Sequence, residues 1–332
     1  MKVALHHRLE AVGRTAWEDL RAGARQRAPF LSWTWLTEWN QAFAADRRID
    51  LFTVADADGT LVGALPLFDA GPGLRRIVGG ADVSDYLDLL ADEGREEEVW
   101  TALLQARAAD RDVWQLHAVP AASPTVTMLP TIAATCGLSA SATVEERCPV
   151  LDLPGSWDDY LATLPSKHRH ELQRKTRRLY REAPDAHISG VRARDEIDTR
   201  LGDFFDLHRR SRVGKERFMD ARMEKFFRRV LGELADLGGA ALWFLDLPSG
   251  PAASFVVLEW DGIVGLYNSG FHPDRATLAP GLVLLAHLVE DAILRGKRRF
   301  DFLRGEERYK YEFGPAAEEV FGVRIGPGQG PA

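Results

Sequence analysis

Ionisable and aromatic side chains crowd into one short segment near the end of the chain. The segment from Phe300 to Gly314 begins like a buried strand and continues into the charged run RGEERYK, from Arg304 to Lys310. Polar groups at the end of a rigid strand are well placed to orient a substrate or to move protons. A plain surface loop accounts for the charges but not for the aromatic residues among them, and both interpretations stay open at this point.

A second polar segment connects a predicted strand to a predicted helix. It runs from Tyr267 to Gly281 and includes Asn268, His272 and Arg275 ahead of the pair Pro280-Gly281. A loop that enters a helix through such a pair leaves unpaired backbone N–H groups at the positive end of the helix dipole, where a pyrophosphate could be held. An ordinary strand-to-helix connection explains the same residues.

His208 ends a third candidate segment. It follows the apolar residues Phe204, Phe205 and Leu207 and precedes a basic run that extends through Lys215. A histidine at this place could act as a base, although the same position is also typical of a capped surface residue or of a core residue.

Other kinds of chemistry lack their sequence signals. The chain has no metal-ligand spacing, nucleophile elbow, Walker loop or dinucleotide fingerprint, so we expect no metal site. Its two cysteines, Cys136 and Cys148, cannot form a disulfide framework or a four-cysteine metal site, which favours a reducing compartment. The 332 residues carry a net charge of -7, which disfavours a globally basic nucleic-acid or membrane binder.

Neither a signal peptide nor a membrane span is expected. Charged residues interrupt Met1 to Leu20, and the longest strongly apolar stretch, Gly281 to Val289, is far shorter than the roughly 20 residues that a span needs. We therefore expect a cytoplasmic protein.

The candidate residues need elements that bring them together, and the pattern predicts a similar order of elements in each half of the chain. The first half reads as a hairpin, a helix and a strand, over 51–55, 60–68, 95–109 and 113–119. The second half reads as a three-stranded meander, a helix and a strand, over 241–247, 252–260, 263–269, 282–293 and 299–303. An equivalent order about 190 residues apart predicts a duplicated α+β unit.

A long basic segment separates the two halves. Residues 165–182 hold seven Lys or Arg against two Glu, with an apolar stripe at Leu172, Leu179 and Tyr180. The pattern predicts a helix whose residues 167–181 either form a solvated face or bind an anionic ligand.

Several of these segments resemble a known family. The most specific likeness is FDFLRGEERYK, from Phe300 to Lys310, and it is supported by 29–39, 63–67, 204–217, 251–253 and 270–281. These segments are similar to the GNAT-superfamily acetyltransferases associated with cellulose-biosynthesis operons, which are also described as BioF2-like or FemAB-like. The likeness covers nearly the whole chain.

The resemblance implies two tandem GNAT-like folds. These are acyl-CoA N-acyltransferase folds of the α+β class, with mixed, mostly antiparallel sheets flanked by helices. We expect a degenerate, structural N-terminal domain over 1–150, a C-terminal domain with the donor and catalytic sites over 151–325, and a flexible tail over 326–332.

The implied donor is an acyl-CoA, either acetyl-CoA or a longer one. In the family a loop patterned Gln/Arg-x-x-Gly-x-Gly/Ala holds its pyrophosphate. Here the loop offers Arg275 and then only Gly281, preceded by a proline that removes one N–H donor. The implied donor-binding residues are His272, Arg275, Ala279, Pro280, Gly281 and Leu282.

Direct acyl transfer needs a base for the amine, a polarised thioester carbonyl and a proton for the leaving thiolate. The resemblance implies Glu306 or Asp301 as the base, with His208 in reserve, and Tyr309 as the acid. Asp301 also has a structural explanation, because an inward carboxylate on a strand can simply bind a neighbouring arginine. The implied substrate-binding residues are Lys215, Asn268, Arg304 and Lys310.

Two other functions stay open. FemAB-like relatives take aminoacyl groups from tRNA, and the basic helix over 167–181 suits either phosphate-rich donor. The second is a non-catalytic GNAT-like scaffold for envelope polysaccharide assembly. The expected acceptor is an amine on a small molecule or on a glycan-linked envelope component, and the sequence does not give its identity.

Overall fold

The chain folds into two compact units. The computed structural model describes residues 1–107, 111–211 and 215–328, and the side chains of residues 215 and 216 lie outside this description. The first unit comprises Met1–Arg147 together with the described residues from Glu318 onward, and the second comprises Cys148–Ala317. In the described part of the chain, no helix has the length and apolar character to cross a membrane.

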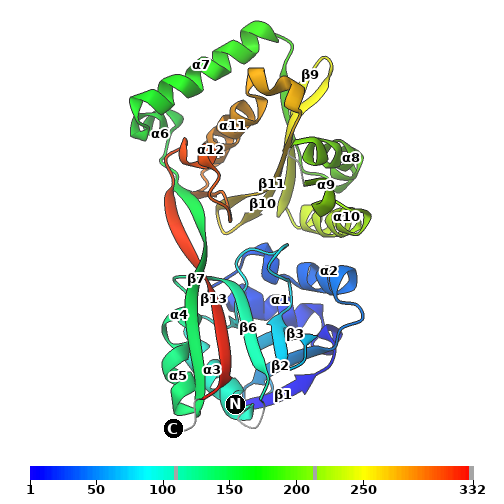
Figure 1. The fold of residues 1–332 in the computed structure, drawn as a ribbon, viewed down its shortest axis with the longest axis vertical. Helices are drawn as coiled ribbons and strands as arrows, with labels where there is room; N and C mark the ends of the chain where they lie inside the picture. The colour runs from blue at the N-terminus through cyan, green and yellow to red at the C-terminus, as the bar shows by residue number, and fades with distance from the viewer. Residues whose placement is uncertain (108–110, 212–214, 329–332) are drawn as a thin grey trace. The chain divides into compact units, whose positions relative to one another are not determined.

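The first unit is built from short helices and a mixed sheet (Figure 1). Its elements are β1 (Lys2–His6), η1 (Leu9–Ala11), α1 (Arg14–Gly23), η2 (Pro29–Leu31), α2 (Trp33–Phe43), β2 (Ile49–Ala55), β3 (Leu61–Gly71), β4 (Leu74–Ile77), β5 (Leu90–Ala91), α3 (Glu96–Ala106), β6 (Val113–Pro120), α4 (Pro124–Thr127), α5 (Leu129–Thr135), the start of β7 (Leu138–Asp152) and most of β13 (Ala316–Pro327).

The sheet of the first unit has the strand order β1-β2-β3-β4-β6-β13-β7, with β5 paired to β3. β4 and β6 are parallel, whereas β1 with β2, β2 with β3, β3 with β4, and β6 with β13 are antiparallel. Helix α3 packs on β1, β2 and β3. Gly63 permits this approach, because a Cβ there would lie 2.4 Å from Cγ1 of Val99.

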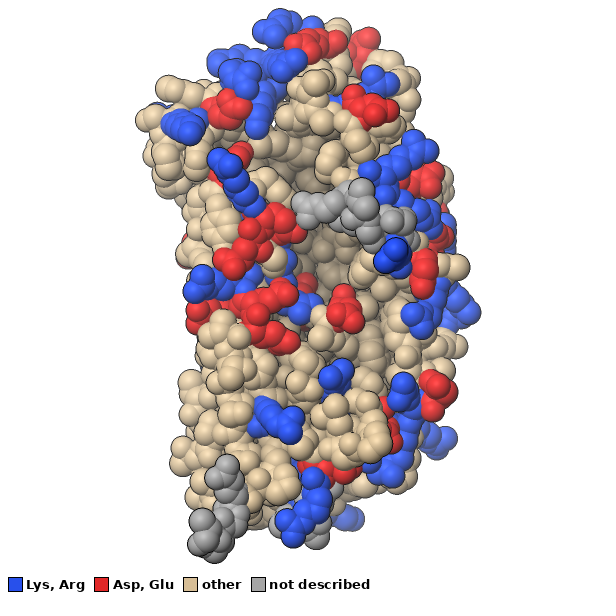
Figure 2. Space-filling view, in the orientation of Figure 1, with Lys and Arg blue, Asp and Glu red and all other residues tan. Residues whose placement is uncertain are grey.

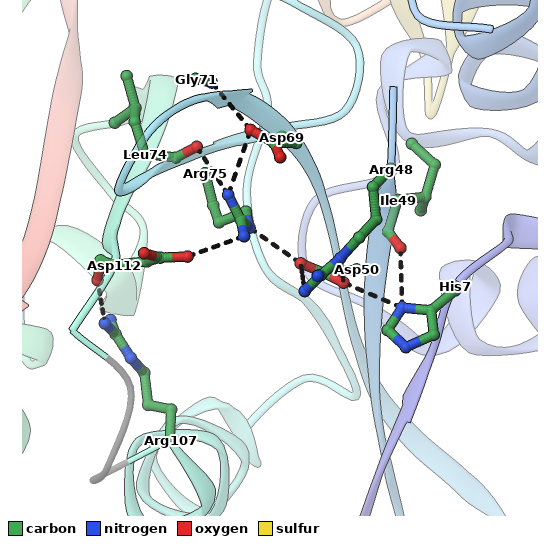
Figure 3. A network of polar contacts seen from close by, with 10 residues as sticks. All are labelled: His7, Arg48, Ile49, Asp50, Asp69, Gly71, Leu74, Arg75, Arg107 and Asp112. Carbon is green, nitrogen blue, oxygen red and sulfur yellow. Dashed lines mark hydrogen bonds and ion pairs between the residues drawn. The ribbon is translucent and has the colours of Figure 1, made fainter. Parts of the chain in front are cut away.

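A network of ion pairs ties β2, β3 and β4 of the first unit together (Figure 3). Arg75 is central: its guanidinium lies 2.9 Å from Asp50, 3.3 Å from Asp69 and 2.8 Å from Asp112. Arg48 donates two further hydrogen bonds to Asp50, both of 2.9 Å. Burial alone would raise the pKa of the Asp50 carboxyl, but the hydrogen bonds from Arg48 and Arg75 lower it overall.

The second unit carries longer helices. Its elements are the end of β7, α6 (Trp157–Thr163), α7 (Ser166–Glu182), β8 (His187–Val191), α8 (Arg194–Ser211), α9 (Lys215–Phe218), α10 (Ala221–Asp236), β9 (Ala240–Leu247), β10 (Gly250–Trp260), β11 (Ile263–Phe271), η3 (Pro273–Leu278), α11 (Pro280–Leu294), β12 (Arg299–Asp301), α12 (Arg308–Tyr311) and the first residues of β13.

The sheet of the second unit has the strand order β7-β12-β11-β10-β9-β8, and its pairs are antiparallel except for β11 with β12, which are parallel. Helices α8 and α10 cover one face of β9 to β11, and α11 covers the other with α7 packed outside it (Figure 1). Because both faces are covered, β9 and β10 are almost continuously apolar. Alternate residues of β9, such as Trp243 and Leu245, join the core beneath α11.

The predicted hairpin and meander, and the helices and strands after them, are present, with boundaries that differ by a few residues. The predicted basic helix is confirmed as α7, and the shorter helix α6 precedes it. The end of the chain differs from the expectation. Residues that were assigned to a C-terminal domain and a tail form β13, which pairs with β6 of the first unit and ends at Pro327. A long-range pairing of this kind leaves no local signal in a sequence.

A buried carboxylate at the end of β10 forms ion pairs with three cations. Glu259 lies 2.6 Å from Arg192, 2.8 Å from Arg295 and 2.7 Å from Lys297. Burial alone would raise its pKa, but hydrogen bonds from these three cations lower it to about 2. The folded pKa is therefore below the unfolded value, and the stabilising contribution is complete above the unfolded pKa.

We expect Glu259→Gln to lower the free energy of unfolding by about 2 kcal/mol at pH 7, because three cations lose their shared anion. The difference from wild type should shrink as the pH falls from about 4.5 toward 2, where the wild-type carboxylate itself is protonated. Urea unfolding of both proteins across this range measures it. A difference that does not depend on pH would contradict the assignment.

Candidate functional site

The second unit holds a pocket of about 240 Å³ where three of its segments meet. The end of β11 forms one wall, the start of α11 forms another, and the segment after β12 closes the third side. The lining residues are Ser211, Phe255, Ser269, Gly270, Phe271, Ala276, Ala279, Pro280, Gly281, Leu282, Glu307 and Tyr309. The two polar segments that the sequence singled out, around 267–281 and 300–314, thus contribute to one pocket.

The pocket lies where the pairing between β11 and β12 ends. They pair only from Ile263 to Gly265, against Arg299 to Asp301, whereas β11 continues to Phe271. The edge of β11 beyond Gly265 therefore has no partner in β12. Its backbone N–H and C=O groups could pair with an extended chain that carries amide groups. A β-bulge in β11, opposite the step from Val256 to Val257, lies on this stretch.

Helix α11 begins at the pocket, as the Pro-Gly pair predicts. Its N-cap, Ala279, is left-handed with φ 50° and ψ 46°, and no side chain caps the helix. The carbonyl of Ala279 accepts from Leu282 and Val283, and Pro280 has no N–H. The Gly281 N–H has no acceptor among the described residues. With no acidic residue in the first turn, this helix end offers a positive dipole and one free donor.

The remaining predicted donor-binding residues lie beside the pocket rather than in its wall. His272 precedes η3, and its Nε2 lies 3.4 Å from Nη1 of Arg210. Arg275 is exposed and donates a 3.1 Å hydrogen bond to the Ser249 hydroxyl. Four of the six predicted donor-binding residues therefore line the pocket, and these two occupy its border.

Two groups that could move protons line the pocket, Glu307 and Tyr309. Glu306, which the sequence suggested as the base, is exposed and accepts a 3.1 Å hydrogen bond from the Tyr311 hydroxyl. Asp301 is buried and accepts the Leu303 N–H at 2.7 Å, where Leu303 has a positive φ of 55°. This contact with a backbone N–H supports the turn after β12.

Lys310 holds the segment between β12 and α12. It is only 4% exposed, and its Nζ lies 2.9 Å from the Arg304 carbonyl, 3.0 Å from the Gly305 carbonyl and 2.9 Å from the Glu307 carboxylate. The ammonium group thus makes two hydrogen bonds and one ion pair. Lys310 therefore positions Glu307 at the pocket, and a substrate could reach it only by displacing one of these contacts.

The other predicted substrate-binding residues do not line the pocket. Asn268 is half-buried on β11, next to the lining residue Ser269. Arg304 is half-buried, and its carbonyl accepts from Lys310. The side chain of Lys215 lies outside the described part of the chain.

His208 lies in the core beneath the pocket. Its ring is 2% exposed and packs between Phe204 and Phe218, each with a ring-centroid distance of 5.7 Å. Helix α8 approaches β11 so closely here that a Cβ on Gly270 would lie 2.5 Å from the backbone nitrogen of His208. His208 therefore supports the strand that carries the pocket, and only a glycine fits opposite it.

We expect Gly270→Ala to destabilise the protein by about 2 kcal/mol, because the new methyl group meets rigid backbone and not a mobile side chain. Gly202→Ala, on the exposed face of helix α8, is the matched control. It should be neutral or stabilise by about 0.5 kcal/mol, because a Cβ there meets nothing within 4 Å and alanine favours the helix. Thermal unfolding of the two variants decides, and equal effects would contradict the packing argument.

Sequence reasoning missed several lining residues, among them Ser211, Phe255 and Glu307. Adjacent acids such as Glu306 and Glu307 carry the same sequence signal, and only the path of the turn after β12 separates them. In the described part of the chain, no group of three or more His, Cys, Asp or Glu side chains could hold a metal ion.

Comparisons with known proteins agree with this architecture. Residues 166–311 match the model of the acetyltransferase (GNAT) domain. The structure is similar to FemX, with a TM-score of 0.65 at 11% identity over 98% of this chain and 97% of that chain. It is also similar to a conserved protein of unknown function from Bacteroides thetaiotaomicron, with a TM-score of 0.63 at 13% identity over 98% and 100% of the two chains.

L-PGS from Bacillus licheniformis is a further structural neighbour, with a TM-score of 0.57 at 13% identity over 93% of this chain and 90% of that chain. No curated protein sequence matches the chain. At such low identities these likenesses concern the fold, and they confirm the predicted architecture. The chain has a tandem GNAT-like fold, and the match to the acetyltransferase (GNAT) domain lies in the second unit, over the segment that contains the pocket.

Proposed function

We propose that this protein is an N-acyltransferase that moves an acyl group from an acyl-CoA to an amine. The observation that carries the proposal is the meeting, in one pocket, of the open β11 edge, the uncapped start of α11, and Glu307 with Tyr309. An extended amide chain such as the pantetheine arm suits a strand edge, and a pyrophosphate suits a helix N-terminus.

In the proposed reaction the acceptor amine attacks the thioester carbonyl carbon. A C–N bond forms, the C–S bond breaks, and the products are an amide and free CoA. Glu307 takes the proton that the amine loses, and the Tyr309 hydroxyl gives a proton to the departing thiolate. A backbone N–H on the open edge of β11 stabilises the negative charge on the carbonyl oxygen.

The first unit supplies a comparison that favours the second as the donor site. A pocket of about 190 Å³ lies at the start of α3, and its lining includes Asp88 and Glu96. The first turn of α3 carries three glutamates, Glu96, Glu97 and Glu98, whereas the first turn of α11 carries no acid. Acidic side chains at this place repel a phosphate, which supports a structural role for the first unit.

We further propose that the chain is of the cellulose-biosynthesis-associated, BioF2-like or FemAB-like type, on the segment from Phe300 to Lys310. Its acceptor is then an amine on a small molecule or on a glycan-linked envelope component. An aminoacyl-tRNA donor is the second candidate. It is favoured by the basic helix α7, over which Lys and Arg side chains gather (Figure 2).

Donor binding can be tested without knowing the acceptor. We expect Gly281→Asp to weaken the affinity for acetyl-CoA at least about tenfold. The new carboxylate would stand at the helix start where the phosphates bind and would repel them. The same change should leave the free energy of unfolding unchanged or raise it by about 0.5 kcal/mol, since an acid in the first turn favours a helix. Calorimetric titration and urea unfolding measure the two effects.

Gly281→Ala is the control, because a Cβ at this position meets nothing within 4 Å. It should bind acetyl-CoA within about threefold of wild type. If wild type binds no acyl-CoA of any chain length, the acyl-CoA proposal fails. Retention of aminoacyl-tRNA by wild type, and its loss when Arg174, Lys175 and Arg178 are reversed in charge, would then support the second candidate.

A further inference from the structure

We propose that a basic cavity between α7 and α12 binds a phosphate group of a substrate. The cavity has a volume of about 370 Å³ and lies wholly within the second unit. Its lining residues are Lys167, His168, Glu171, Lys175, Arg308, Tyr311 and Glu312. The four residues from α7 follow helical spacing and share one face, which is turned toward α12.

Two cations of the cavity are unpaired. The side chains of Lys167 and Arg308 make no ion pair or hydrogen bond with any residue in the described part of the chain. Lys175 lies 3.5 Å from Glu171, which Arg174 also holds through two hydrogen bonds of 2.8 Å. These contacts lower the pKa of Glu171 to about 2, with the Arg174 hydrogen bond as the main cause.

The charges around the cavity do not cancel. Three lining cations, Lys167, Lys175 and Arg308, stand beside the two lining carboxylates of Glu171 and Glu312. The lining therefore carries an excess of one positive charge, which favours an anion such as a phosphate group. Like charges held together at a surface are unfavourable until an anion joins them, so the cluster indicates a ligand more than a contribution to stability.

The start of α7 points to the same ligand class. No side chain caps the helix, and no acid stands in its first turn. The N–H groups of Ser166, Lys167 and His168 have no acceptor in the described part of the chain. The Nδ1 of His168 is also buried without a hydrogen-bond partner there. Basic residues at the positive end of a helix dipole are unfavourable there. A bound phosphate would interact favourably with both the basic side chains and the dipole.

The cavity lies beside the transfer pocket. The short helix α12 supplies Tyr309 to the pocket and Arg308 and Tyr311 to the cavity. A substrate whose phosphate occupies the cavity could therefore extend to Tyr309 within one helical turn. Either the acceptor or the ribose phosphate of the donor could supply that group, and this link to transfer chemistry rests on the proposed function above.

Calorimetric titration with inorganic pyrophosphate in a phosphate-free buffer tests the cavity directly. We expect the double variant Lys167→Glu/Arg308→Glu to bind pyrophosphate at least about tenfold more weakly than wild type, because two charge-assisted contacts become repulsive. The neutral variant Lys167→Gln/Arg308→Gln should show a smaller loss in the same direction. The control Arg177→Glu/Arg181→Glu makes the same charge change elsewhere on α7 and should bind within about twofold of wild type.

Equal losses in the control and the test variant would overturn the proposal, and so would unchanged binding in the test variant. Thermal unfolding shows that each variant is folded. The source of the phosphate follows from titrations with CoA and with dephospho-CoA. A loss of affinity in Lys167→Glu/Arg308→Glu for CoA alone assigns the cavity to the donor, and unchanged affinity for both assigns it to the acceptor. Absence of CoA binding in wild type would remove the proposed function but would leave the pyrophosphate result intact.

Discussion

Glu307→Gln is expected to lower kcat by about 100- to 1000-fold with little change in the affinity for acetyl-CoA. The carboxylate lines the transfer pocket and is the group there that can take the proton of the acceptor amine. A glutamine keeps the shape of the side chain but cannot accept a proton. Tyr309→Phe should lower kcat by about 10- to 100-fold, since it removes the proposed donor to the leaving thiolate. Steady-state kinetics with a surrogate amine, together with calorimetric titration of acetyl-CoA, measure both.

The adjacent acid provides the matched control. Glu306→Gln makes the same chemical change one residue earlier, at an exposed position whose carboxylate accepts from Tyr311. It should keep kcat within about twofold of wild type. If instead Glu306→Gln inactivates the enzyme while Glu307→Gln does not, the base assigned from the sequence holds and the one assigned from the pocket is wrong. A protein that keeps its cellular role in Glu307→Gln and Tyr309→Phe would support the scaffold alternative.

Lys310→Met is expected to lower the free energy of unfolding by about 3 kcal/mol and to reduce activity in the protein that stays folded. The buried ammonium donates to the Arg304 and Gly305 carbonyls and pairs with Glu307, and its removal takes one contact from each of the three. The cost stays near the lower end for a broken buried pair, because the Glu307 side chain is 38% exposed. Urea unfolding measures the loss.

Lys225→Met is the control for this change. Lys225 is exposed on α10, and the same substitution there should change the free energy of unfolding by less than about 0.5 kcal/mol. The structural role of Lys310 also predicts the sign of the kinetic effect. A residue that positions Glu307 affects kcat, whereas a residue that only contacts the acceptor affects KM. A rise in KM at constant kcat and unchanged stability would support the substrate-binding role that the resemblance implies.

Only some features of the pocket could be predicted from the sequence. The helix that begins at Pro280 and the presence of strand β12 were predictable, because a Pro-Gly start and an alternating apolar pattern are local signals. The strand ends at Asp301, two residues before its predicted end at Leu303. The choice between Glu306 and Glu307 was not, because the turn after β12 depends on Lys310 folding back onto the Arg304 carbonyl. The parting of β11 from β12 also depends on which residues pair across the sheet.

The basic helix α7 also shows what could not be predicted from the sequence. Its charge, length and apolar stripe were evident from the sequence, but the two interpretations of a solvated face and an anion site could not be separated. The structure divides the charges. Arg174 and Arg178 are paired within α7, with Glu171 and Glu182, whereas Lys167 faces a cavity that α12 closes with Arg308. Only the packing of a distant segment makes part of this helix a candidate site.

The sequence by itself determined the class of fold, the order of its elements in each half and the two segments that contribute to the pocket. These features depend on side-chain periodicity, turn residues and helix starts, which act over a few residues. The tertiary structure decided which acid lines the pocket, that His208 and Lys310 serve as supports, and that the last strand pairs with β6. Those outcomes depend on contacts between residues far apart in the chain, and a sequence carries no local signal for such contacts.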